Sequence, residues 1–444
     1  MKKLSGLFLG DRVIWFVFFA LSIISVVEVF SALSRLTYES GSFIGPIAHH
    51  AAFLLMGLVV VLIVHRLPCR AFRIVLPFAA LFSIVLLVLL LMGFGITLNG
   101  ASRWFNFFGI PLQPSEIAKG TMIIYTALVL SWNQTEKGAA PGTFKLIFVP
   151  TVVVCGLIAP ENLSTAILLF IIITLMMFIG RISVITMGKM FGVLAITASI
   201  LIGSLLAISK EQAAGIAKVK FGKRVPTWKN RIESVIDGKT KKLSPKDFDI
   251  DTDAQKGHSN IAIATSNIIG KGPGNSVQRD FIPHAYSDFI YAIIVEELGF
   301  VGAAGVVLLY MLLLLRVGYI ARSFRESSFP PFLAMGLALL IVVQALANMF
   351  VATGPFVTGQ PLPLISSGGT STLVNCAYIG MILSVSRLAK KQERKHKAAA
   401  PISSPTPEMP GPTDTAPEYI PPAELTAREI ASANFGSDTD GRQE

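Results

Sequence analysis

Charge is scarce in this sequence. Only 15% of its 444 residues are Asp, Glu, Lys or Arg and 52% are hydrophobic, whereas soluble domains have about 25% charged residues. Cysteine is scarce too, and Cys69, Cys155 and Cys376 all fall in or beside apolar segments, so no disulfide framework is expected. The composition excludes an ordinary water-soluble globule and predicts a chain that folds in lipid.

Long apolar runs are abundant, and many have the length that crosses about 30 Å of hydrocarbon. The first run is too long for a cleaved signal peptide and lacks an A-x-A-like site behind it, so we expect it to be retained. We predict an all-α polytopic membrane protein of about ten transmembrane helices. The expected helices are 13–33, 49–65, 73–98, 116–132, 145–160, 163–181, 186–208, 284–318, 331–353 and 369–389.

Positive charge sets the expected orientation. Lys and Arg concentrate at both chain ends and in short connections such as 66–73, which the positive-inside rule places in the cytoplasm. The net charge of +11 therefore fits anionic lipid, and we expect no nucleic-acid partner. The predicted parts are a cytoplasmic N-terminus (1–12), seven helices (13–208), a large extracytoplasmic loop (209–283), three helices (284–389) and a disordered cytoplasmic tail (390–444).

Ionisable residues in an apolar segment are costly and mark candidate sites. Asp288 falls at the outer start of helix 284–318, and Glu296 and Glu297 follow about 12 Å deeper at 1.5 Å per residue. That separation exceeds the roughly 5 to 9.5 Å of paired glycosidase carboxylates. Asp288 must therefore act alone or with a cation. Alternatively, it is an acid that the helix N-terminus merely favours.

Three further segments hold candidate binding residues. Arg103, Glu116 and Lys119 lie in GASRWFNFFGIPLQPSEIAKG (100–120), where Lys119 either binds an anion or pairs with Glu116 at i, i+3 and snorkels. GKGPGNSVQ (270–278) lacks the ending of a P-loop, so we expect no nucleotide there. GQPLPLISSGGTS (359–371) predicts broken backbone that lines a cavity.

Together, GASRWF, QPSEIAKG, GKGPGNSVQ, SDFIYAIIVEELGFVG and PLPLISSGGTS resemble, in this order, the SEDS family of peptidoglycan polymerases over about residues 12–390. GNSVQ is more similar to the FtsW and SpoVE members than to RodA. The chain departs from the family at His284, where a glutamate is common, and at Asn162, where an aspartate is common. Because of these two departures the chain lacks an acidic residue that could act together with Asp288 at either position, whereas Asp288 itself is present.

The resemblance implies a glycosyltransferase of the bacterial inner membrane that polymerises lipid II into β-1,4-linked glycan during division. Asp288 would be the general base, and undecaprenyl pyrophosphate the leaving group. The implied partners are a growing glycan strand, a class B penicillin-binding protein and other division proteins. The pyrophosphate admits a divalent cation, Mg²⁺ or Mn²⁺. The residues expected to line the pyrophosphate cavity are Arg103, Lys119, Glu116, Lys271, Asn275, Ser276, Ser366, Gly368 and Gly369.

Two other functions remain open from the residues. A lipid II flippase would also place ionisable residues and broken helices between membrane segments. A scaffold that only positions other division proteins would need no chemistry. An assay of purified protein with lipid II separates the three functions. Polymer would indicate the enzyme, scrambling alone the flippase, and neither result the scaffold.

Overall fold

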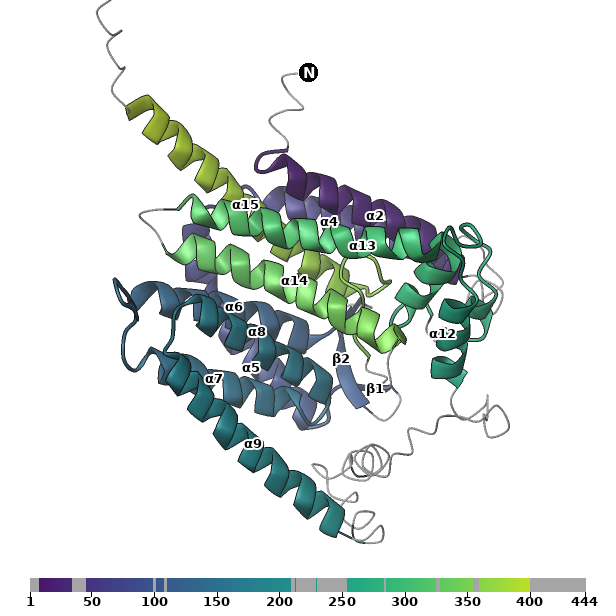
Figure 1. Cartoon of the computed structure of the whole chain (residues 1–444), viewed down its shortest axis with the longest axis horizontal. Coiled ribbons are helices and arrows are strands. Elements are labelled where there is room, and N and C mark those ends of the chain that lie inside the picture. Colours follow the sequence, from purple (N-terminus) through teal and green to yellow (C-terminus); the bar gives the residue numbers. More distant parts are fainter. Residues whose placement is uncertain are drawn as a thin grey trace, which may run out of the picture. The chain divides into compact units, whose positions relative to one another are not determined.

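The computed structural model describes residues 8–33, 45–98, 101–107, 110–208, 212, 229, 254–282, 285–324, 328–353 and 359–399 (Figure 1). The chain divides into two units, Met1–Lys395 and His396–Glu444. Most of the predicted loop and residues 400–444 of the predicted tail lie outside the described residues. Residues 390–399, which were predicted to belong to the disordered tail, are helical instead.

Each predicted helical range contains a helix within the described residues. Most boundaries agree within a few residues of the expectation. The helices are α2 (Arg12–Ala32), α4 (Gly45–Val64), α5 (Cys69–Leu91), α6 (Pro114–Trp132), α7 (Thr143–Ile158), α8 (Leu163–Ile179), α9 (Val184–Ala207), α13 (Ile290–Arg322), α14 (Phe329–Thr353) and α15 (Thr370–Ala399).

The chain is a multi-pass membrane protein. Among the described residues, seven helices are long and apolar enough to cross a membrane, namely α2, α4, α5, α9, α13, α14 and α15. Helices α7 and α8 are apolar but have only 16 and 17 residues, and α6 carries Glu116 and Lys119. Ten spans therefore stay a prediction.

Helix α14 is the central element of the Met1–Lys395 unit. It packs against α13 on one side and against α6 and α8 on the other, and α13 in turn packs against α2 (Figure 1). Its buried side chains are largely apolar, but they include the amides of Gln344 and Asn348. These two amides donate hydrogen bonds to the non-helical segment before α15.

The segment after α5 corrects the prediction of a helix over 73–98. Helix α5 ends at Leu91 and Gly93 follows with φ of 92°. A three-stranded antiparallel sheet then forms from β1 (Ile96–Leu98), β2 (Ala101–Phe107) and β3 (Ile110–Leu112), in that order. The aromatic residues of β2 and the β-branched residues of β1 and β3 are residue types enriched in strands. Strand β2 holds Arg103 in place.

Helix α13 also differs from its predicted form, because it starts at Ile290 and contains a break at Gly299. Gly299 has φ of 71° and ψ of −173°, a region that essentially only glycine occupies. The backbone of Gly270 crosses here, and a Cβ on Gly299 would lie 2.4 Å from Gly270 N. The described part of 209–283 also contains α12 (Ala254–Ala264) and the 3-10 turn η2 (Gln278–Asp280).

Asp11 joins the start of α2 to α13. Its side chain caps α2 through the N–H of Val13 and accepts two hydrogen bonds from Arg316, at 3.0 and 2.7 Å. Burial alone raises the pKa of this carboxyl, but the hydrogen bonds from Arg316 and Val13 outweigh burial and leave the pKa below its ordinary value. Asp11 therefore stays ionised at neutral pH, and the contribution of its ionisation to stability is lost only as the pH falls through that lowered pKa.

We predict that Gly299→Ala destabilises the protein by about 2 kcal/mol or more, since it combines a forbidden backbone conformation with a clash. Gly305→Ala, in the same helix with nothing within 4 Å of its added Cβ, is the matched control and should be neutral or slightly stabilising. Thermal unfolding in detergent measures both. Equal midpoints would show that the break at Gly299 is not required.

Candidate functional site

Asp288 and Arg103 converge over Gly359. Asp288 lies in the turn before α13 and is partly exposed. A Cβ built on Gly359 would lie 2.9 Å from Arg103 Nη1 and 3.3 Å from Asp288 Oδ2, so these two atoms are within about 6 Å of each other. The Nε of Arg103 donates to the carbonyl of Glu161 at 3.2 Å. The fold thus brings a carboxylate and a guanidinium together from distant parts of the sequence.

The segment 359–369 is the broken backbone that the sequence predicted. It runs without helix between α14 and α15, and Leu364 within it has φ of 65°. Its carbonyls accept from side chains of other elements: Gln360 O from Asn348, Pro361 O from Gln344, Pro363 O from Tyr310 and Ile365 O from Ser25. These bonds replace the missing helical ladder, as irregular backbone between membrane helices requires.

The same segment holds the turn that carries Asp288. Asn348 donates to the carbonyl of Asp288 at 2.9 Å as well as to Gln360. Ser366 donates to the carbonyl of Ser287 at 2.6 Å. The Oγ of Ser287 in turn donates to Asp288 Oδ1 at 3.1 Å. The backbone that carries the carboxylate is therefore held by Asn348 and Ser366, and Ser287 donates to the carboxylate itself.

Gly368 and Gly369 form the tight turn into α15. Gly369 has φ of 54°, and a Cβ on Gly368 would lie 2.4 Å from Ser371 Oγ. Thr370 then donates to the carbonyl of Pro111, which ties the start of α15 to strand β3. Both glycines therefore shape the site's backbone.

Glu116 and Lys119 form a buried ion pair on α6. Their oxygen and nitrogen are 2.8 Å apart, with side-chain exposures of 2% and 0%. Lys119 also donates to Gln344 Oε1 at 2.8 Å, and Gln344 donates to Pro361 O. The structure thus shows the i, i+3 pair without snorkelling, and it links Lys119 to the broken segment. Direct pyrophosphate binding by Lys119 stays a prediction.

Lys271, Asn275 and Ser276 belong to a second cluster, around Glu296 and Glu297. Glu297 accepts from the backbone N–H groups of Gly274 and Ser276 at 2.9 and 3.0 Å. Glu296 pairs with Lys271 at 2.5 Å and accepts from Ser276. Asn275 instead donates to the carbonyl of Lys271. The glycine-rich segment is thus wrapped around two buried carboxylates at the break in α13.

Several buried polar atoms near Asp288 have no hydrogen-bond partner among the described residues. They are Asn348 Oδ1, Gln360 Oε1 and Asn162 Nδ2. Two of these atoms belong to side chains that hold the broken segment in place. Asn348 donates to the carbonyl of Gln360, and Gln360 Nε2 donates to Thr165 Oγ1. Such atoms suit a polar ligand with both donors and acceptors.

The amides at 344, 348 and 360 were missed by sequence reasoning. Gln344 and Asn348 stand in the middle of an apolar helix, where a polar side chain is itself a site signal. Attention to charged residues alone passed over them. The Asn162 departure has a structural answer, because Asn162 caps α8 by accepting from Thr165 N at 3.2 Å. His284 lies outside the described residues.

Comparison with known proteins gives the family. The family described as cell cycle protein, FTSW_RODA_SPOVE, matches residues 11–391. The probable peptidoglycan glycosyltransferase FtsW of Haemophilus influenzae is 31% identical over 385 residues, covering 85% of this chain and 90% of the relative. That of Halomonas elongata is 30% identical over 79% of this chain and 84% of the relative. The peptidoglycan glycosyltransferase MrdB of Escherichia coli K12 is 28% identical over 84% and 93%.

Solved structures agree on the fold. A chain from the structure titled "Structural coordination of polymerization and crosslinking by a peptidoglycan synthase complex" has a TM-score of 0.64 at 24% identity, covering 85% of this chain and 98% of that one. The rod shape determining protein RodA of Thermus thermophilus has a TM-score of 0.57 at 20% identity, covering 85% and 97%. The fold and site define a polytopic SEDS-type membrane protein. The chain belongs to the FtsW/RodA/SpoVE family, and it is most similar to the FtsW members.

The buried pair on α6 gives a stability prediction. Lys119→Met leaves the Glu116 carboxylate buried without its cation and should cost about 3–5 kcal/mol. Adding Glu116→Gln in the double variant should recover part of that loss, because no unpaired charge remains. Lys137→Met, at an exposed position, is the control. Strictly additive effects in thermal unfolding would contradict the pairing.

Proposed function

We propose that this chain is a peptidoglycan glycosyltransferase that polymerises lipid II during cell division. The observation that carries the proposal is the convergence of Asp288 and Arg103 over Gly359, where a Cβ would meet both. Support comes from the FtsW and MrdB relatives, which are named peptidoglycan glycosyltransferases. The GNSVQ segment and the FtsW relatives favour a role in division over elongation.

The proposed reaction is attack of a sugar hydroxyl on an anomeric carbon. Asp288 takes the proton from the 4-hydroxyl of the acceptor sugar as a general base. The new carbon–oxygen bond forms as the bond to undecaprenyl pyrophosphate breaks, with inversion from α to β. Partial exposure leaves the Asp288 carboxylate accessible. Ser287 donates to this carboxylate, and Asn348 holds the backbone carbonyl of Asp288.

The leaving pyrophosphate requires positive charge more than it requires an acid. Arg103 is placed for this role, because a planar guanidinium binds phosphate oxygens in a bidentate manner. Lys119 supports the site through Gln344 and the broken segment. We therefore assign the direct contact to Arg103 and the supporting role to Lys119.

A divalent cation fits this arrangement in one way. Among the described residues no group of three His, Cys, Asp or Glu side chains is placed to hold a metal. Mg²⁺, however, is often bound by one or two carboxylates together with substrate phosphates. Asp288 and a pyrophosphate would supply such a set, and the cation would neutralise charge on the leaving group.

A membrane-anchored transpeptidase is the proposed partner. The similar fold in a peptidoglycan synthase complex supports a class B penicillin-binding protein in this role. Helix α13 leaves one stripe of side chains exposed at the spacing of a helix–helix seam. The stripe comprises Leu308 (67% exposed), Leu312 (38%), Leu315 (72%) and Tyr319 (67%). A single transmembrane helix could pack along it.

Asp288→Asn tests the catalytic assignment. The variant keeps the shape of the side chain and removes the base, so polymer formed from lipid II should fall by about 10²- to 10⁴-fold. Asp288→Glu should rescue little, because a shift of about 1 Å can itself cost on the order of 10²-fold. Glycan products are measured on gels with purified protein.

Asp280→Asn is the control for this experiment, since Asp280 is 53% exposed in the loop before the site. It should retain polymerisation. If folded Asp288→Asn elongates glycan at the normal rate, the base lies elsewhere. If the unaltered protein moves lipid II between leaflets without forming polymer, the flippase hypothesis replaces the proposal.

The partner surface is tested with Leu312→Trp/Leu315→Trp on α13. Recovery of the co-expressed transpeptidase should fall several-fold, because bulky rings prevent close helix packing. Val193→Trp/Ile196→Trp, at two exposed apolar positions of α9, is the matched control and should recover the transpeptidase normally. Equal recovery with both variants would move the interface away from α13.

A further inference from the structure

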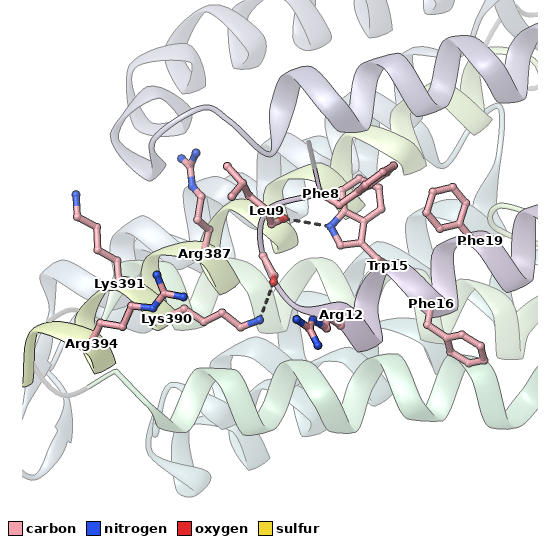
Figure 2. A pocket seen from close by; sticks show the side chains of 11 residues that line it. Phe8, Leu9, Arg12, Trp15, Phe16, Phe19, Arg387, Lys390, Lys391 and Arg394 are labelled. Carbon is pink, nitrogen blue, oxygen red and sulfur yellow. Dashed lines mark hydrogen bonds between the residues drawn. The ribbon is translucent and has the colours of Figure 1, made fainter. Parts of the chain in front are cut away.

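A second pocket lies between the start of α2 and the last turns of α15. Its volume is about 720 Å³, and Figure 2 shows cationic side chains from both helices on one side and aromatic rings on the other. The pocket shares no residue with the site around Asp288. What this pocket binds is therefore independent of the proposed transferase activity.

Few acidic side chains neutralise the cations on this side of the pocket. The cations are Arg12, Arg387, Lys390, Lys391 and Arg394. Among the described residues that line the pocket there is no Asp or Glu. Asp11, which precedes Arg12 in the sequence, lies 3.9 Å from Lys390 but already accepts two hydrogen bonds from Arg316.

Two of these cations hold the pocket together and three are available. Lys390 donates to the carbonyl of Gly10 at 2.7 Å, and Arg387 donates to the carbonyl of Arg66 at 2.9 Å. In the described part of the chain, Arg12, Lys391 and Arg394 have no hydrogen-bond or ion-pair partner. The pocket is thus a built framework that is lined by three further cations (Figure 2).

The other side of the pocket is apolar and ordered. Trp15 donates to the carbonyl of Leu9 at 3.1 Å, stacks on Phe19 at 5.7 Å and meets Phe8 edge-on at 5.0 Å. Phe16, one turn after Arg12 on the same helix, is 61% exposed. A cationic end thus adjoins an exposed apolar face.

We propose that this pocket binds the headgroup of an anionic phospholipid. A phosphodiester would lie among Arg12, Lys391 and Arg394, and an acyl chain would run along Phe16 and the apolar face of α2. Basic pockets at the ends of transmembrane helices are suited to anionic headgroups. The positive-inside rule places these chain ends, and hence the bound lipid, in the cytoplasmic leaflet.

The apolar neighbours favour a lipid over free phosphate or an acidic peptide. Inorganic phosphate would leave Phe16 in contact with solvent, and a soluble peptide would have to reach side chains on a membrane-spanning helix. A phospholipid matches both halves of the pocket at once. The charge gives selectivity for anionic over zwitterionic headgroups, and the rings add affinity through burial of the acyl chain.

The test uses the full chain, delipidated in neutral detergent, and measures binding by native mass spectrometry. Phosphatidylglycerol should bind at least about tenfold more tightly than phosphatidylcholine. Lys391→Gln/Arg394→Gln should weaken phosphatidylglycerol binding by about 10- to 30-fold, since each cation near such a surface contributes about 1 kcal/mol. Phe16→Ser should weaken lipid binding but leave any binding of inorganic phosphate unchanged.

Lys145→Gln/Lys189→Gln is the matched control. Both lysines are exposed, lie on the side that we predict to be cytoplasmic, and belong to other helices. This control should bind phosphatidylglycerol normally. Equal affinity for the two lipids, equal losses in both double variants, or displacement of the lipid by an acidic peptide or by inorganic phosphate at similar concentration would each overturn the proposal.

Discussion

Backbone polar groups that lack a helical partner are the constraint on which the rest of this structure depends. In hydrocarbon such groups must be satisfied by protein. The segment 359–369 breaks the helical pattern, and its carbonyls accept from Ser25, Tyr310, Gln344 and Asn348. Those side chains come from α2, α13 and α14, so satisfying one segment fixes three helices around it. The turn with Asp288 is held by a further bond from Asn348 and by Ser366 of the same segment, so the position of the site depends on how this segment is satisfied.

Three buried acids near the candidate site have their charge compensated by neighbouring protein groups, which distinguishes them from Asp288. Glu116 has Lys119 at 2.8 Å and almost no exposure. Glu296 has Lys271 and backbone donors, and Glu297 has the N–H groups of the glycine-rich segment. All three are committed to structure. Asp288 is the one in this set that is partly exposed and shares a space with a guanidinium. A base needs this combination of accessibility and fixed direction.

Helix positions were predictable because hydrophobic length is a strong signal. The break before α15 was predictable from its prolines and glycines. The strand around Arg103 was not, because a short aromatic run in an apolar chain fits a helix or an interfacial belt as well as a strand. The break at Gly299 depends on the crossing of Gly270, which comes from a segment 29 positions earlier, and sequence pattern carries no such contact. The pairing of Lys119 with Glu116 was one of two alternatives that the sequence left open, and the burial of Lys119 against Gln344 needed the tertiary structure.

Helices α2 and α15 connect the two sites. From Arg12 to Ser31 on α2 the rise is about 28 Å at 1.5 Å per residue, close to the thickness of the hydrocarbon core. Ser31 donates to Glu297 at one end of α2, whereas Arg12 lines the basic pocket at the other. On α15, Thr370 bonds to β3 near Arg103, and Arg394 lines the pocket about 36 Å away. Helix α15 therefore reaches from the sheet that holds Arg103 to the basic pocket, and α2 reaches from the cluster around Glu297 to the same pocket. The proposed transferase chemistry and the proposed lipid binding would then use different ends of one framework, without competition for the same space.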